Sequence, residues 1–179
     1  MKKFLVLIAA LCFLAGLAGT AAAAPATFFD FDGDQVADTL FGPIASGSSF
    51  TADIYFTGLE ELKMEEVIPA DDGLQSFGFS LSFNGAWVNV SEITVAPSWF
   101  LPSTITIDNS AGLASVFGGR LGGITNEPIL LASFDFDKIE KNLLTLTMEE
   151  LPPASFAAFV TASGIELDEL GKPDNSIFE

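Results

Sequence analysis

The stretch at residues 74–95, LQSFGFSLSFNGAWVNVSEITV, decides the fold. Apolar side chains occupy every second position from Phe77 to Phe83, the period of two that places them on one face of a β-strand. The second half of the stretch is rich in valine and isoleucine, which favour strands. Between the two halves stands Asn84-Gly85, a pair that readily adopts positive φ angles, so we predict that the two strands form a hairpin.

The same alternation continues on both sides of this stretch. In SSFTADIYFTG, at residues 48–58, Phe50, Ala52, Ile54 and Phe56 share one face. About nine short strands, separated by Gly, Pro, Asn and Asp, predict an all-β fold, an antiparallel β-sandwich with a core built largely from phenylalanine. The remaining strand candidates lie at residues 27–31, 103–108, 113–118, 129–136, 142–148 and 156–162.

The ends of the chain differ from its middle. Residues 1–23 combine two early lysines with an apolar run and alanines, the pattern of a signal peptide that is removed on export. We therefore expect a bacterial protein that is secreted, periplasmic or at the cell surface, with one domain at 24–165 and an acidic C-terminal tail at 166–179. Within the domain, LEELKMEEVI at 59–68 is either a short helix or an acidic connection between strands.

The chain is strongly acidic, with a formal net charge of −17. Removal of the leader takes away two lysines and no acid, which changes the net charge to −19. A surface of this charge repels phosphate groups and anionic lipids, so we expect neither nucleic acid nor a membrane as a partner. The composition favours cations and neutral or basic surfaces instead.

The segment DFDGDQVAD at residues 30–38 has the spacing of a loop that wraps a hard cation. Calcium binds oxygen, and such loops place carboxylates at relative positions 1, 3, 5 and 9 and a backbone carbonyl at position 7. Gln35 stands where a glycine is common, and a hydrated acidic turn without metal is the alternative interpretation. We predict a structural calcium ion. Its predicted ligands are Asp30, Asp32, Asp34, the carbonyl of Val36, and Asp38.

The residue types that common catalytic mechanisms need are missing. The chain has no histidine, and its one cysteine is Cys12 of the leader, which removes Ser-His-Asp and Cys-His catalysis and the usual zinc sites. Neighbouring acids such as Asp71 and Asp72 point to opposite faces of a strand, so we interpret the acid pairs as solvated charges. The glycine-rich FGGRLGG at 117–123 is interpreted as a mobile loop that presents Arg120. We predict that the protein is not an enzyme.

Two tryptophans are candidates for a binding surface, because their rings stack on sugars and anchor protein interfaces. Trp87 lies in a predicted strand, where packing in the core is the better interpretation. Trp99 lies in APSWFLP, a stretch typical of a loop, and both core packing and surface exposure stay open for it. We predict Trp99 as the ligand-binding residue.

Three longer segments resemble a known family. GSSFTADIYFTGLEEL and GLQSFGFSLSFNGAWVNVSEITV resemble the opening half of cohesin-like domains, and PILLASFDFDKIEKNLLTLTM is similar to their later part. The resemblance covers roughly residues 44–162 and implies a jelly-roll sandwich of about nine strands, related to carbohydrate-binding modules. It also implies a role in extracellular assemblies, where such domains bind dockerin-type proteins or glycans. Separately, DFDGDQVAD resembles the aspartate loops of FG-GAP and thrombospondin type 3 repeats.

Together these observations predict an exported, non-enzymatic binding or adhesion module that recognises a protein or a polysaccharide and is stabilised by calcium. One alternative is a carbohydrate-active enzyme on the same sandwich, which would require carboxylates that converge in a cleft. The other alternative is a purely structural surface or matrix protein, which would associate with itself and need no separate ligand.

Overall fold

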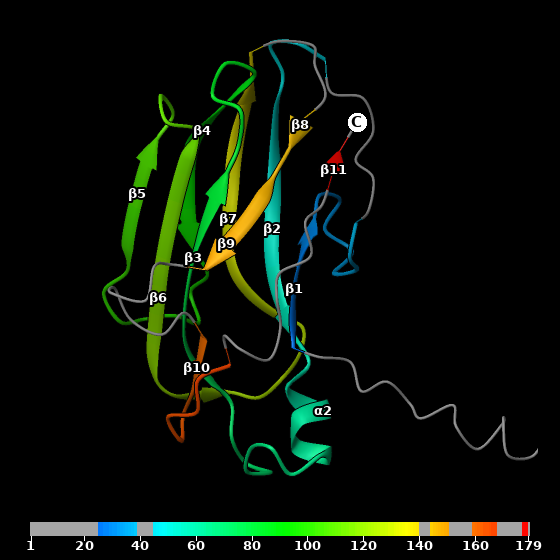
Figure 1. Cartoon of the computed structure of the whole chain (residues 1–179), viewed down its shortest axis with the longest axis vertical. Helices are drawn as coiled ribbons and strands as arrows, with labels where there is room; N and C mark the ends of the chain where they lie inside the picture. The colour runs from blue at the N-terminus through cyan, green and yellow to red at the C-terminus, as the bar shows by residue number, and fades with distance from the viewer. Residues whose placement is uncertain (1–24, 39–44, 140–143, 151–158, 168–176, 179) are drawn as a thin grey trace, which may run out of the picture.

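A computed structural model describes residues 25–38, 45–139, 144–150, 159–167 and 177–178. The predicted signal peptide lies outside the described residues. Two antiparallel sheets face each other and form a sandwich (Figure 1). The all-β prediction is therefore confirmed. No helix among the described residues is long and apolar enough to cross a membrane.

The first sheet has the strand order β1-β2-β7-β4, and every neighbouring pair is antiparallel. Its strands are β1 (Ala26–Asp30), β2 (Ser49–Thr57), β7 (Ile129–Lys138) and β4 (Val88–Val95). The long central strands β2 and β7 are about eighty residues apart in sequence, so this sheet forms only when these distant segments come together.

The second sheet has the order β10-β3-β6-β5, and β9 also pairs with β3. Its strands are β3 (Leu74–Ser82), β5 (Thr104–Asp108), β6 (Leu113–Ile124), β9 (Thr147–Glu150) and β10 (Phe159–Thr161). A small third sheet pairs β8 (Leu144–Thr145) with β11 (Ile177–Phe178). The strand candidates of the sequence thus correspond to strands of the structure, with their ends shifted by several residues.

Phenylalanine rings fill the space between the two sheets, as predicted. Phe79 of β3 lies 5.9 Å from Phe134 of β7, measured between ring centroids, and Phe83 lies 6.2 Å from Phe136. Each of these rings is buried. Burial of one such side chain stabilises the fold by roughly 1.5–3 kcal/mol, so the alternating pattern of the sequence supplies the main attraction between the sheets.

The predicted hairpin between β3 and β4 is wrong, because the two strands belong to different sheets. Neither Asn84 nor Gly85 has a positive φ angle. Instead the Asn84 side chain accepts a hydrogen bond from the Ala86 N–H at 3.0 Å, and the chain crosses from one sheet to the other. Gly85 passes so close to the Asn109 carbonyl that a Cβ atom would lie 2.0 Å from its oxygen. Close backbone approach, and not turn geometry, therefore explains the glycine.

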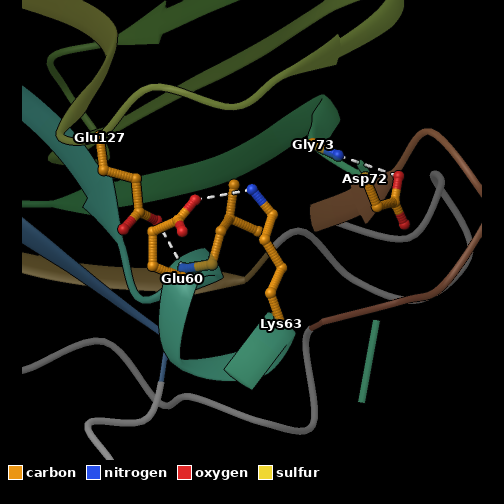
Figure 2. A network of polar contacts seen from close by, with 6 residues as sticks. Glu60, Lys63, Asp72, Gly73 and Glu127 are labelled. Carbon is orange, nitrogen blue, oxygen red and sulfur yellow. Dashed lines mark hydrogen bonds and ion pairs between the residues drawn. The ribbon is translucent and has the colours of Figure 1, made fainter. Parts of the chain in front are cut away.

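The acidic stretch after β2 contains a short helix, α2 (Leu59–Met64), which resolves the two alternatives for residues 59–68. Its first backbone N–H, that of Leu59, donates to the Glu127 carboxylate at 2.5 Å, so a side chain that is distant in sequence caps the helix (Figure 2). Lys63 pairs with Glu60 at 2.7 Å on the helix surface. Leu59 and Leu62 are buried and attach the helix to the core.

Two further predictions need correction. FGGRLGG is part of the long strand β6 and is not a loop, since Gly119 pairs with Ser76 and Ile124 with Leu74. The domain also extends beyond residue 165, because Leu167 is buried and its N–H donates to the Phe159 carbonyl at 2.8 Å. Residues 168–176 of the predicted tail lie outside the described residues.

Candidate functional site

The aspartate loop, residues 30–38, begins at the last residue of β1. Asp30 is only 2% exposed, and its carboxylate accepts hydrogen bonds from three backbone N–H groups of the loop. The donors are Asp32 at 3.1 Å, Gly33 at 2.7 Å and Gln35 at 2.8 Å. Gln35 has a φ angle of 64°, the left-handed conformation that the glycine of related loops would adopt without strain. Asp30 therefore organises the turn from its buried side.

The end of the loop folds back onto β1. The Asp38 carboxylate accepts the Phe31 N–H at 2.7 Å, and the Asp38 N–H donates to the Phe29 carbonyl at 2.9 Å. Asp34 accepts the Val36 N–H at 2.8 Å. The loop is thus closed by its own hydrogen bonds, which are the ones expected of aspartates in turns.

Three of the predicted metal ligands converge. One carboxylate oxygen each from Asp30, Asp32 and Asp38 lies within 4.8 Å of the other two. Oxygens at 2.3–2.6 Å from a shared calcium ion, as in known sites, would lie at most about 5 Å apart, so these three groups fit one ion. Asp34 is not a member of this group, and Val36 is exposed.

The negative charges of the loop act on one another. The Asp34 N–H donates to Asp32 and lowers the pKa of that carboxyl group, but desolvation and the charges of Asp34, Asp38 and Asp30 outweigh this hydrogen bond. The pKa of Asp32 is therefore raised above its ordinary value of 3.8. A bound divalent cation would relieve this repulsion.

The two sheets present solvent faces of opposite character. On the first sheet, hydroxyl groups and carboxylates alternate across β2 and β7, with hydrogen bonds from Ser49 to Asp137 at 2.8 Å and from Ser133 to Asp53 at 2.5 Å. Thr51 bonds to Asp135 in the same way. We call this surface the acidic face. Its acidic residues are Asp53, Glu92, Asp135 and Asp137.

In the second sheet, the outward side of strands β3, β6 and β5 has few charges, and Glu149 of the neighbouring strand β9 pairs with Ser80 at its margin. Directly paired residues of antiparallel strands point to the same side, so the register of β3, β6 and β5 defines which side chains share this face. Hydroxyl and small side chains predominate, with one carboxylate. We call it the β3–β6–β5 face, and it consists of Gly78, Ser80, Ser82, Thr104, Thr106, Asp108, Leu113, Ser115 and Phe117. Gly78 and Ser80 of β3 are buried, and exposure increases toward β5.

Trp99 is a core residue. Its ring is 4% exposed, its indole N–H donates to the Leu130 carbonyl at 2.9 Å, and it lies edge-on to Phe77 with 4.9 Å between centroids. The residue is in a loop, as predicted, but a buried ring offers no surface to a ligand, so its assignment as a ligand contact is wrong. Trp87, predicted to be a core residue, is half-buried beside the β3–β4 crossover and lines an open cleft there.

One member of the acid pairs is also buried, contrary to prediction. Asp71 is exposed, but Asp72 is 4% exposed and accepts the Gly73 N–H at 2.9 Å and the Ser163 N–H at 3.1 Å. Burial raises the pKa of Asp72, and hydrogen bonds from Ser163, Thr161 and Gly73 outweigh this effect, so the pKa is lowered overall. Figure 2 shows Asp72 beside Gly73, at the loop that leads into β3.

No family model and no curated protein matches the chain. Solved structures of cohesins match the chain in fold. A type II cohesin domain from the cellulosome of Acetivibrio cellulolyticus is 9% identical, with a TM-score of 0.60 over 87% of this chain and 95% of that one. The cohesin–dockerin complex of OlpA from Clostridium thermocellum is 11% identical, with a TM-score of 0.59 over 87% and 98%.

A non-cellulosomal cohesin from the archaeon Archaeoglobus fulgidus is 12% identical, with a TM-score of 0.55 over 87% of this chain and 90% of that one. Identities this low establish the fold and nothing finer. The chain is accordingly a cohesin-like β-sandwich, which confirms the resemblance seen in its strand pattern.

Proposed function

We propose that this protein is an exported, non-enzymatic module that binds a protein partner through the β3–β6–β5 face. The main support for this proposal is the difference in charge between the outward faces of the two sheets. In a chain of net charge −17, strands β3, β6 and β5 contribute a single carboxylate to the face, that of Asp108, and Glu149 of β9 borders it opposite Ser80, whereas the acidic face contains four. Protein interfaces have few charges at their centre, so the β3–β6–β5 face is the better candidate for burial against a partner.

The composition of the face supports a protein partner. Serine and threonine hydroxyls offer adaptable hydrogen bonds without the desolvation cost of a charge. Leu113 and Phe117 supply apolar area beside them, and Leu113 is 41% exposed. A flat strand surface of this kind suits a partner element of similar size more than a small ligand, which prefers a concave site.

Dockerins are the first class of partner to test, because the OlpA cohesin was solved in complex with one. We expect the protein to bind at least one member of a dockerin panel in biolayer interferometry. Leu113→Asp should weaken that binding at least about tenfold, because it replaces exposed apolar area of the face with a second carboxylate beside Asp108. Binding should be measured at two salt concentrations, since a charge-driven contact would weaken with salt.

Val67→Asp is the matched control, because Val67 is also 41% exposed and lies outside the face. Equal loss of binding in both variants would contradict the proposed surface. Recognition of polysaccharides alone, on a glycan array, would move the function to carbohydrate binding. Hydrolysis of a glycan by the purified protein would favour the enzyme alternative, although the described carboxylate cluster belongs to a turn-forming loop.

Export rests on the leader pattern of residues 1–23. A secreted, periplasmic or cell-surface location is consistent with an acidic domain that keeps no cysteine after leader removal and is held by its phenylalanine core.

We further propose that calcium binds the aspartate loop and stabilises the first sheet. Calcium at about one hundred times its Kd would stabilise the folded state by about 2.7 kcal/mol, which for a domain of this size corresponds to a rise in Tm of roughly 5–10 °C. Thermal unfolding with EDTA and with calcium measures this rise. Equal Tm values in the two conditions would leave the hydrated acidic turn as the correct interpretation.

Asp32→Asn should abolish the calcium-dependent rise, because Asp32 is exposed and contributes one of the converging oxygens. Asp71→Asn removes the same charge from an exposed site outside the loop and should leave the rise intact. A rise that persists in Asp32→Asn would show that the ion binds elsewhere.

A further inference from the structure

The free edges of the two sheets are protected in different ways, with one exception. At β1, the aspartate loop covers the edge through the hydrogen bond from Asp38 to Phe29. At β4, the side chain of Asn109 bonds to both the N–H and the carbonyl of Val90, at 2.8 and 3.0 Å, and a bulge precedes Glu92. Such covers, bulges and charges prevent a sheet from pairing with another chain.

The opposite edge of the second sheet is also protected. The three-residue strand β10 is bulged and bonds to the segment that follows it, through Thr161 to Ile165 and Leu167 to Phe159. The sequence of β9 contains two glutamates. Among the described edge strands of these two sheets, β5 has neither a cover nor a bulge, and its one charge is Asp108 at its end.

The strand β5 has the sequence TITID and lies at the outer margin of its sheet (Figure 1). All five residues are exposed, and none of the described backbone hydrogen bonds reaches its outer edge. Ile105 and Ile107 point to the same side as the core residues Val116 and Ala114, yet they are 41% and 37% exposed. The core is therefore open at this edge.

We propose that β5 pairs antiparallel with β5 of a second copy of this chain, with Thr106 on the twofold axis. In that register each Ile105 faces Ile107 of the other copy. The exposed isoleucine side chains at the core edge of each copy would then be buried against each other. Each Thr104 faces Asp108 of the other copy, a hydroxyl–carboxylate pair of the kind that the protein uses three times between β2 and β7.

Charge permits this register and this partner, and centring on Thr106 is the register that pairs all five residues of both strands. The strand has one charge, Asp108 at its end, so two copies of a strongly acidic protein can approach here with little repulsion. Pairing centred on Thr106 keeps the two Asp108 carboxylates at opposite ends of the new strand pair. About four to six backbone hydrogen bonds would form, and the two second sheets would become one continuous sheet.

The expected dimer is weak, because two five-residue strands bury less than the roughly 1,200 Å² at which stable interfaces begin. Sedimentation equilibrium of the purified protein should show a monomer–dimer equilibrium with a Kd on the order of 100 µM. Thr106→Asp should shift the protein to monomer at every concentration, because two carboxylates would meet on the axis. Thr94→Asp, at an exposed position on the edge strand β4, is the matched control and should dimerise like the wild type.

Cysteine cross-linking tests the register independently of affinity. Leader removal leaves no native cysteine, so an introduced thiol reports only its own position. Thr106→Cys should form an intermolecular disulfide at least about tenfold faster than Thr104→Cys, because only position 106 faces itself. Circular dichroism confirms that each variant is folded.

A wild-type protein that stays monomeric well above 100 µM would overturn the proposal, as would dimers that Thr106→Asp leaves intact or equal cross-linking at positions 104 and 106. Thr104 and Thr106 also belong to the proposed partner-binding face, so sedimentation and cross-linking are measured on the protein without any partner, and their outcome does not depend on whether that face binds one.

Discussion

Single residues in this fold take their roles from partners that are distant in sequence. Trp99 is flanked by prolines in a loop, yet its indole N–H reaches the Leu130 carbonyl and its ring packs on Phe77. A buried tryptophan needs such a partner for its N–H, and here β7 of the first sheet supplies it, while Phe77 belongs to the second sheet. The same side chain without that carbonyl would have been a plausible surface anchor.

Trp99→Ala should lower the free energy of unfolding by about 3–5 kcal/mol, the range for removing a buried aromatic side chain. Urea unfolding followed by circular dichroism measures the change. Phe100→Ala is the adjacent control, because Phe100 is exposed and lies in a cation–π pair with the Arg120 guanidinium, so its loss should cost at most about 1 kcal/mol. Equal stability of Trp99→Ala and the wild type would return this ring to the list of surface candidates.

At the scale of elements, connections differ more from expectation than strands do. The Asn84-Gly85 pair has the composition of a hairpin turn, but the phenylalanines of β3 and the valines of β4 must cover the core from opposite sides. A hairpin would have placed both strands in one sheet. The burial of the apolar faces of β3 and β4 in opposite sheets therefore determines the crossover, and the turn residues do not.

Asp72 links two elements in a comparable way, since it joins the loop before β3 to the turn after β10. Because its folded-state pKa lies below 3.8, this carboxylate stabilises the fold above the unfolded-state pKa, and that contribution is lost as the pH falls through the folded-state pKa.

We expect Asp72→Asn to destabilise the protein by about 1–3 kcal/mol at neutral pH, because the buried donors of the turn lose a charged acceptor. The difference from the wild type should shrink between about pH 5 and pH 2. Urea unfolding at several pH values measures this, with the exposed Asp71→Asn as the control. A difference that is constant over this pH range would exclude a contribution from Asp72 ionisation.

At the scale of the whole molecule, acidic side chains and apolar exposed groups lie on different faces and edges of the sandwich. One sheet carries the acidic face, and the other carries the nearly neutral β3–β6–β5 face and the open edge of β5. If two copies join at β5, their binding faces lie side by side on one sheet. A multivalent partner would then bind more tightly than a single site allows, so weak self-association and partner binding would support each other.

The sequence by itself determined the features that depend on neighbours along the chain. Alternating apolar residues specify strands because the period of a strand is two, and the aspartates of residues 30–38 close their own loop through short-range hydrogen bonds. The strand pattern was also sufficient to indicate a cohesin-like sandwich. For the same reason, Asp30, Asp32 and Asp38 could be named as a group before their positions were known.

Only the tertiary structure decided the features that depend on residues brought together from far apart. These are the sheet to which β4 belongs, the burial of Trp99 and Asp72, the Glu127 cap of α2, and the neutral face shared by β3, β6 and β5. Each depends on the register between strands that lie tens of residues apart. That register is set by the packing of the whole core, which no local pattern contains.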